Sequence, residues 1–447
     1  MKVVVLNGSP KGNYSITLQT IQYLAKIYPM HEFRILHIGQ HIRMYEKDMT
    51  KAIEAIQEAD LLLFSYPVYT FIAPSQLHRF IELLKVQNID LSSKYATQIT
   101  TSKHFYDVTA HRYIQDNCVD LGLKFIKGLS ADMDDLLTDK GQKEARAFFD
   151  YIVWSMKVGH YEPVPKCTQR TSSIPVESGE EVEKRSGNVV IVTDLCEDDL
   201  QLQSMIIRFQ RRLPIQSRVI NLRNVRIDGG CLGCFNCAVD GKCIYKDKFD
   251  EFLRNDIQKA EAIVYAFTIK DHSMGALFKK YDDRNFCNGH RTVTMGMPLG
   301  YLISGNYSQE ANVKMIIEAR SEVGGNFFAG VACDEVDPNT EIDRLADTLT
   351  YALEKKYVQP SNFYGVGGMK IFRDLIYVMQ GMMKADHKFY KQHGQYDFPQ
   401  KQKGRLILMY VVGFMLSNPS IKAKLGNKMN EGMLMPYKQL FAKLENK

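Results

Sequence analysis

The feature that most constrains the fold is a strand–helix alternation in residues 1–158 that restarts near residue 188. Apolar runs typical of buried strands occur at Val3–Leu6, Phe33–Ile38, Leu61–Phe64 and Tyr95–Ile99. Stretches with helical spacing separate these runs, which predicts a parallel sheet covered by helices on both faces. A linker rich in Pro, Ser, Glu and Lys follows at 159–187, and Asn188–Val192 then begins a second set of strands.

The second set aligns with the first as a diverged repeat. Residues 34–38 match 218–222 at an offset of 184, and residues 57–83 match 258–284 at an offset of 201. The offset grows because the second copy holds about 17 additional residues between the two matches, including a cysteine cluster. We therefore predict an insertion in a βα loop, although shared α/β patterning alone is an alternative explanation of the similarity.

Length and composition place few limits on this arrangement. The chain has 447 residues, which favours two or three domains over one, and 45% hydrophobic with 24% charged residues is ordinary for a soluble globular protein. The first residues run directly into a strand, which leaves no room for a signal peptide. The longest apolar run, Leu406–Leu416, is eleven residues, about half of the ~20 needed to span a membrane. We therefore expect a cytoplasmic protein without a transmembrane segment.

Positive charge is concentrated in the last part of the chain. Residues 355–447 hold 16 Lys and Arg against 5 Asp and Glu. Such a tail could attract nucleic acid, anionic lipid or an acidic redox partner, but a set of solvated helix faces is the favoured explanation. Because the tail lacks the clustered Arg and aromatic residues of nucleic-acid readers, we expect no nucleic-acid partner.

A hydroxyl-rich turn follows the first predicted strand. The segment Gly8–Thr17 leads into a helical stretch, and a helix N-terminus with Ser and Thr hydroxyls is a favourable phosphate site. An ordinary capped turn is the alternative, since Ser and Thr are common N-caps. The predicted ligand-binding residues here are Ser9, Lys11, Ser15, Ile16 and Thr17.

Two further strand ends carry candidate ligand residues. Ligands of open α/β sheets bind beyond the carboxyl ends of the strands. The predicted strand at Leu61–Phe64 ends in a rigid turn with an aromatic ring, and a polar segment, Thr100–His104, follows the next strand. The residues predicted to bind here are Pro67, Val68, Tyr69, Thr101 and Ser102, and an ordinary polar loop is the alternative explanation of the Thr100–His104 segment.

Four cysteines of the second copy have the spacing C-x2-C-x2-C-x5-C. They are Cys231, Cys234, Cys237 and Cys243. Consecutive C-x2-C steps favour an iron–sulfur cluster, whereas structural zinc usually uses two separated pairs. Zinc and metal-free thiols remain alternatives. The other five cysteines show no such spacing and are interpreted as buried or incidental thiols.

These motifs resemble those of known flavoproteins. Gly-Ser-Pro-x5-Ser-x-Thr after the first strand, and Tyr-Pro-Val-Tyr-x3-Ala-Pro-x2-Leu after the third, resemble the NADPH-dependent FMN reductase group of flavodoxin-like proteins. The resemblance implies FMN, with Ser9, Ser15 and Thr17 at its phosphate and the Pro67–Tyr69 turn beside its ring. In this setting the cysteine run resembles the iron–sulfur flavoproteins, which implies a [4Fe–4S] cluster.

The second copy departs from the flavin pattern. Its first loop, Thr193–Asp199, carries acidic residues where a phosphate would sit, and like charges disfavour an anion. The turn equivalent to Pro67–Tyr69 is Thr268–Lys270. We therefore predict no second FMN, and a pseudo-dimer in which the cysteines of one copy approach the flavin of the other.

The resulting prediction is an α/β protein with two flavodoxin-like doubly wound domains, at 1–158 and 188–344, and a helical C-terminal extension at 345–447. Its expected function is a flavin-dependent oxidoreductase that passes electrons between NAD(P)H or a carrier, FMN and an iron–sulfur cluster. A non-enzymatic electron carrier is the alternative, and a homo-oligomer is one option for its assembly. An Asp386-His387 pair could be catalytic, but a histidine on a helix is usually structural.

Overall fold

The computed structural model describes residues 1–163, 173–421, 434, 438, 441, 442 and 444. The chain divides into two compact units, residues 1–389 and 390–447. The first unit contains both copies of the repeat and every residue discussed below as part of a site. We call residues 1–158 the first copy and residues 188–344 the second copy.

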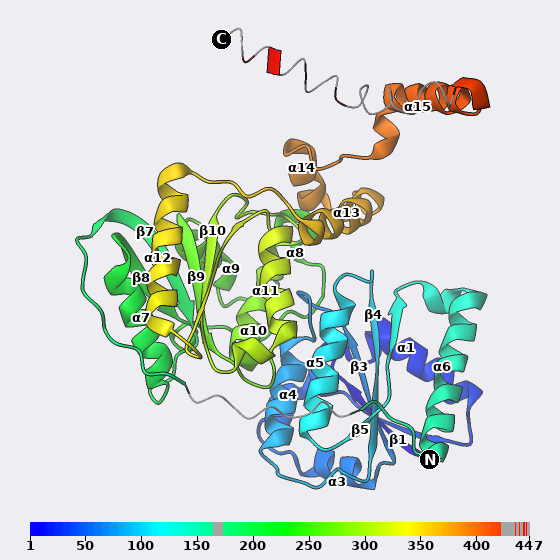
Figure 1. Ribbon diagram of the computed structural model, residues 1–447. Helices are drawn as coiled ribbons and strands as arrows, with labels where there is room; N and C mark the ends of the chain where they lie inside the picture. Colours follow the sequence, from blue (N-terminus) through cyan, green and yellow to red (C-terminus); the bar gives the residue numbers. More distant parts are fainter. Residues whose placement is uncertain (164–172, 422–433, 435–437, 439–440, 443, 445–447) are drawn as a thin grey trace. The chain divides into compact units, whose positions relative to one another are not determined.

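The first copy folds around a parallel sheet (Figure 1). Its strands follow the order β2-β1-β3-β4-β5, and β6 pairs with β4. The strand bounds are β1 Lys2–Asn7, β2 Glu32–Leu36, β3 Leu61–Pro67, β4 Tyr95–Ser102, β5 Lys124–Phe125 and β6 Leu129–Asp132. Val, Leu and Phe fill β1 and β3 because both strands are buried by helices on their two faces.

The second sheet repeats this order as β8-β7-β9-β10-β11. Its strands are β7 Arg185–Thr193, β8 Ile215–Asn221, β9 Ala262–Thr268, β10 Pro298–Ser304 and β11 Phe327–Cys333. Both sheets therefore have the 2-1-3-4-5 order of doubly wound flavodoxin-like proteins. The predicted fold class is confirmed.

The backbone supports the predicted alignment of the copies. Strands β3 and β9 begin at residues 61 and 262, which is the predicted offset of 201. Thr70 and Phe71 have positive φ angles of 44° and 73°, and their counterparts Asp271 and His272 have 49° and 61°. The same strained turn thus follows the third strand of each sheet. The sequence missed one boundary: β2 ends at Leu36, and Ile38 begins a helix.

Helices cover both faces of each sheet. Their bounds are α1 Ile16–Ile27, α2 Ile38–Tyr45, α3 Thr50–Glu58, α4 Ser75–Lys85, α5 Asp107–Asp120, α6 Asp139–Val158, α7 Leu200–Arg212, α8 Cys237–Asp240, α9 Phe249–Phe252, α10 Gly275–Arg284, α11 Ala311–Val323, α12 Pro338–Lys355, α13 Phe363–Val378, α14 Lys384–Gln392 and α15 Lys403–Leu416. Helices α1 and α6 pack on one face of the first sheet, and α7 and α12 pack on one face of the second. Among the residues that the structure describes, no helix is both long and apolar enough to cross a membrane.

Helices α4, α5, α10 and α11 join the two copies through one continuous core. Apolar residues of α4 and α5 belong to the same buried cluster as those of α10 and α11, with Phe80, Tyr113, Phe278 and Ile316 among them. The two sheets therefore dock through equivalent helices, as a homodimer of two such domains would. Residues 231–243, called the cysteine segment below, lie between β8 and β9 in the chain, in the predicted βα insertion.

Polar contacts at this junction centre on His272 of the second copy. Its Nδ1 lies 2.9 Å from Glu310 Oε1, and its Nε2 lies 3.0 Å from Asp120 Oδ2 in the first copy. Asp120 also contacts Lys85 Nζ at 2.6 Å, and Lys85 contacts Asp271 at 2.9 Å. Burial lowers the pKa of His272, but the hydrogen bonds and charges of the two carboxylates outweigh burial and raise this pKa to about 10.

This raised pKa predicts a pH-dependent stability of the docked copies. Protonated His272 stabilises the fold fully below about pH 6.5, its unfolded pKa, and that contribution falls as pH rises towards 10. We expect the free energy of unfolding, measured in urea at pH 6 and pH 9.5, to fall by on the order of 2 kcal/mol through this group. His272→Gln should remove this part of the pH dependence.

The exposed His41 of α2 provides the matched control, because His41→Gln leaves the contacts of Asp120 and Glu310 intact. The wild-type slope should therefore persist in His41→Gln. An unchanged slope in His272→Gln would show that other groups govern the alkaline loss of stability.

Candidate functional site

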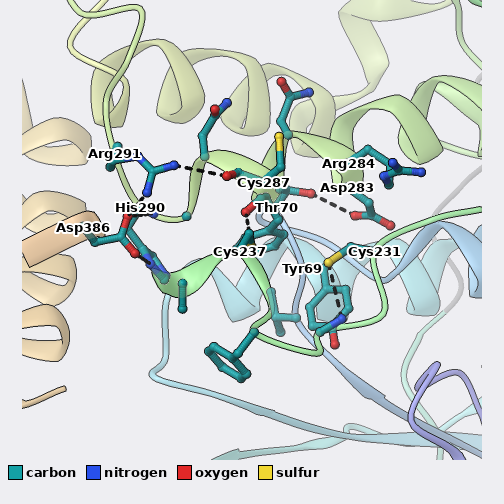
Figure 2. A pocket seen from close by; sticks show the side chains of 18 of the residues that line it. Tyr69, Thr70, Cys231, Cys237, Asp283, Arg284, Cys287, His290, Arg291 and Asp386 are labelled. Carbon is teal, nitrogen blue, oxygen red and sulfur yellow. Dashed lines mark hydrogen bonds and ion pairs between the residues drawn. The ribbon is translucent and has the colours of Figure 1, made fainter. Parts of the chain in front are cut away.

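One cavity of about 480 Å³ brings the predicted site residues together. This volume lies in the range typical of small-molecule and cofactor sites. Every residue predicted from the sequence lines it: Ser9, Lys11, Ser15, Ile16, Thr17, Pro67, Val68, Tyr69, Thr101, Ser102, Cys231, Cys234, Cys237 and Cys243. Loops from both copies therefore form a single site, part of which is drawn in Figure 2.

The segment Gly8–Thr17, predicted from the sequence to bind phosphate and called the phosphate loop below, leads into the N-terminus of α1. The hydroxyl oxygen of Ser15 accepts a hydrogen bond from Leu18 N at 3.4 Å and caps the helix. Its hydroxyl proton is left to donate to a ligand. Thr17 Oγ1 lies 2.6 Å from Thr101 Oγ1, which connects this loop to the end of β4. Since the first turn of α1 holds no acidic residue, the helix end favours an anion.

The turn after β3 is held by the second copy. Lys279 is fully buried, and its Nζ donates to the Tyr69 carbonyl at 3.0 Å. The same ammonium contacts Asp283, and Asp283 accepts a hydrogen bond from Ser75 N at 2.7 Å. The Tyr69 ring packs edge-on against Phe286 of the second copy at 5.8 Å. Burial, together with the nearby Cys231 and Asp283, raises the pKa of Tyr69, so its hydroxyl stays protonated.

The cysteine segment lies directly against the phosphate loop and the Pro67–Tyr69 turn of the first copy. Gly233 has a φ of 60°, and a Cβ at this position would lie 2.0 Å from Tyr69 Oη and 3.1 Å from Lys11 Cε. A side chain is therefore excluded at this close approach. Lys11 Nζ lies 5.2 Å from the centre of the Phe235 ring, and Gln76 donates to the Cys231 carbonyl at 3.4 Å. Burial lowers the pKa of Lys11, and the nearby Cys231 and Cys234 oppose this effect.

The four thiols share the cavity but do not form a preassembled metal site. Within the described part of the chain, no group of three or more Cys, His, Asp or Glu residues is placed to hold one metal ion. Cys237 Sγ instead donates to the Phe286 carbonyl at 3.2 Å. Burial and the neighbouring thiols raise the pKa of Cys237 to about 11. The four thiols are therefore not gathered around one point, and ligation of a metal would require their side chains to turn towards each other.

In the second copy, carboxylates of the protein itself occupy the loop that corresponds to the phosphate loop. Asp199 caps α7 by accepting a hydrogen bond from Leu202 N at 3.4 Å, and it also accepts one from the Thr268 hydroxyl. Asp194 is buried, and its carboxylate lies 4.0 Å from Lys270 Nζ. Burial raises the pKa of Asp194 to about 6, while Lys270 and Arg223 oppose this shift. A carboxylate thus occupies the helix end where the first copy leaves room for a ligand.

Part of the cavity was missed by the sequence reasoning. Buried Arg284 pairs with Asp247 through two contacts of 2.7 and 2.8 Å and stacks on Tyr245, beside the cysteine segment. Asp386, which the sequence pairs with His387, instead contacts Arg291 and the backbone of His290. These residues carry no motif, because their proximity arises from the docking of distant segments.

Comparison with known proteins gives one family match. Residues 1–112 match the family NADPH-dependent FMN reductase, so the N-terminal domain carries the sequence signature of that family. No curated protein matches the chain.

Solved structures similar to part of this chain include three proteins described as reductases or oxidoreductases. A candidate quinone reductase from Klebsiella pneumoniae is 15% identical, with coverage of 38% of this chain and 89% of that chain and a TM-score of 0.28. The apo form of an NADH:FMN oxidoreductase is 17% identical, with coverage of 36% of this chain and 91% of that chain and a TM-score of 0.31. An NAD(P)H:quinone oxidoreductase from Methanothermobacter marburgensis is 12% identical, with coverage of 36% of this chain and 98% of that chain and a TM-score of 0.28.

Proposed function

We propose that this chain is an NAD(P)H-dependent FMN oxidoreductase that binds one FMN between its two copies. The proposal is carried by one observation: the phosphate loop, the Pro67–Tyr69 turn and the cysteine segment line the same cavity. The family match of residues 1–112 supports the FMN and nicotinamide part of the proposal.

In this proposal the first copy binds FMN and the second copy orients it. The N-terminus of α1, with Ser9, Ser15 and Thr17, would bind the phosphate, and Ser102 would donate to a polar group of the cofactor. Thr101 would donate to Thr17 and accept a hydrogen bond from the cofactor, since these two hydroxyls already share a hydrogen bond. When bound, FMN supplies hydride acceptance and one- or two-electron transfer. Lys279 of the second copy donates to the Tyr69 carbonyl and so fixes the backbone of this turn. The proposed contact between Tyr69 and the flavin ring therefore depends on the docking of the two copies.

We further propose that Cys231, Cys234, Cys237 and Cys243 ligate a [4Fe–4S] cluster. Support comes from their spacing and from the contact of Gly233 with Tyr69 and Lys11. A bound cluster would supply one-electron transfer. The exposed position of Cys234 and the absence of secondary structure across residues 231–235 are compatible with rearrangement around a cluster.

The proposed function is tested by the absorption spectrum of anaerobically purified protein, with flavin, iron and zinc counted in the same sample. One FMN per chain and rapid bleaching of the flavin by NADH or NADPH are expected. A protein without flavin would overturn the proposal. Stoichiometric zinc without iron would show that the four cysteines hold a structural zinc ion and not an iron–sulfur cluster.

A non-enzymatic electron carrier is the second candidate. The cavity is lined by the phosphate loop, the Pro67–Tyr69 turn and redox-capable cysteines, which a carrier would need as much as an enzyme. Flavin reduction by reduced ferredoxin, but not by NADH or NADPH, would favour the carrier.

A further inference from the structure

The cavity extends beyond the loops assigned to FMN. A second group of lining residues comes from the segment after α10 and from α13 and α14, and Figure 2 shows His290, Arg291 and Asp386 of this group. The residues of this group that we call the distal arm are Phe286, Cys287, His290, Arg291, Thr292, Ile371, Phe372, Leu375, Met379, Met383 and Asp386.

Apolar side chains dominate the distal arm. Phe372 stacks on Phe105 with ring centres 4.3 Å apart and meets the His290 ring edge-on at 4.6 Å. Met379 and Met383 supply flexible thioethers, which adapt to aromatic surfaces. Such a wall suits a flat, uncharged ring.

Asp386 is the polar exception in this arm. Its side chain is fully buried, and Oδ1 accepts hydrogen bonds from His290 N at 3.2 Å and from Arg291 Nη1 at 3.3 Å. The backbone is shaped for this carboxylate: Gly289 has a φ of 60°, and a Cβ there would lie 2.4 Å from Oδ1. The Arg291 guanidinium also offsets the negative charge of the carboxylate.

The other oxygen of Asp386 lacks a donor. Within the described residues, Oδ2 accepts no hydrogen bond, and His290 Nδ1 lies 3.8 Å from it, beyond hydrogen-bond distance. Buried carboxylate oxygens normally accept hydrogen bonds, because leaving one without a donor costs free energy. If Asp386 served only to join α14 to Arg291, nothing in that role would offset the free-energy cost of burying an oxygen without a donor.

We propose that the distal arm binds a neutral hydroxyaromatic compound whose hydroxyl donates to Asp386 Oδ2 and whose ring packs on Phe372 and Met379. Ligand carboxylates are disfavoured, because a second anion would lie beside Asp386. This ligand would occupy the cavity of the proposed function, and a redox reaction of the ligand rests on that function. Binding itself requires no turnover.

The test compares 1-naphthol with 1-methoxynaphthalene, which has the same rings but no hydroxyl donor. Both are titrated into the purified full-length protein, and binding is followed by the fluorescence of the naphthalene ring. Since a hydrogen bond to a charged group contributes about 1.5–3 kcal/mol, 1-naphthol should bind at least about tenfold more tightly. Asp386→Asn should reduce this preference to less than about threefold.

Lys388→Gln is the matched control, since Lys388 is exposed on the same helix. It should keep the wild-type preference. Phe372→Leu should weaken both compounds by similar factors while keeping the preference, and it serves as the second variant if Asp386→Asn does not fold. Equal affinity of the two compounds in the wild-type protein would overturn the proposal, as would an unchanged preference in Asp386→Asn.

The failures of the two proposals are distinguishable. If flavin is present and reduced by NAD(P)H but the protein does not prefer 1-naphthol, the distal-arm proposal fails alone. If 1-naphthol is preferred but the protein holds no flavin, the proposed function fails and the binding site stands.

Discussion

Replacing Ser15 and Thr17 together by alanine should reduce the affinity of the protein for FMN by at least about tenfold. Each hydroxyl is positioned at the N-terminus of α1 on the cavity wall, and hydrogen bonds to a charged group contribute about 1.5–3 kcal/mol each. Thr17 also contacts Thr101, so its loss loosens the end of β4. The measurement is titration of apoprotein with FMN, followed by quenching of flavin fluorescence.

Loss of the Ser15 cap also destabilises α1, by about 1 kcal/mol. Asp337→Ala controls for this effect, because Asp337 caps α12 by accepting a hydrogen bond from Thr340 N at 3.2 Å and lies outside the cavity lining. The control should lose similar stability and keep its FMN affinity. Undiminished affinity in the double variant would place the phosphate elsewhere, as would an FMN retained by a chain that lacks residues 1–158.

Changing Cys234 to serine should remove most of the iron from anaerobically purified protein while FMN remains bound. Serine is a poor replacement for a thiolate ligand, and the phosphate loop belongs to the other copy, so the two cofactors should be lost independently. The wild-type protein should contain about four irons per chain, the complement of the implied cluster. Flavin reduction by NAD(P)H should persist in the variant, while transfer to a one-electron acceptor should become much slower.

Cys196→Ser is the matched control, because Cys196 is half-buried in the same copy and lies outside the cavity. It should keep both iron and flavin. If the wild-type protein carries no iron, the four thiols have another role, in agreement with their separated placement in the structure. Equal one-electron rates in the wild type and in Cys234→Ser would show that the flavin acts without the cysteine segment.

Local sequence determined the elements of the fold. Val, Leu and Ile runs bounded by turns identified β1, β3 and β7, because buried parallel strands need apolar side chains on both faces. The hydroxyls around Ser15 marked a helix N-terminus for a similar reason, since the free N–H groups there require acceptors. Cysteine spacing identified a candidate cluster because the ligands lie within one short segment. In each of these cases the relevant contacts are close in sequence.

Only the tertiary structure decided how the two copies meet. The contacts of Gly233 with Tyr69, of Lys279 with the Tyr69 carbonyl and of Asp386 with Arg291 join residues that are far apart in the chain. Their formation depends on the docking of α4 and α5 against α10 and α11, which buries one shared apolar core. Packing of that kind depends on shape and burial across many residues, so no short motif encodes it. The sequence by itself therefore determined the main strands and helices of the two copies and the candidate ligand residues, and its repetition predicted that the copies pair. The tertiary structure decided through which helices they dock and which side chains line the shared cavity.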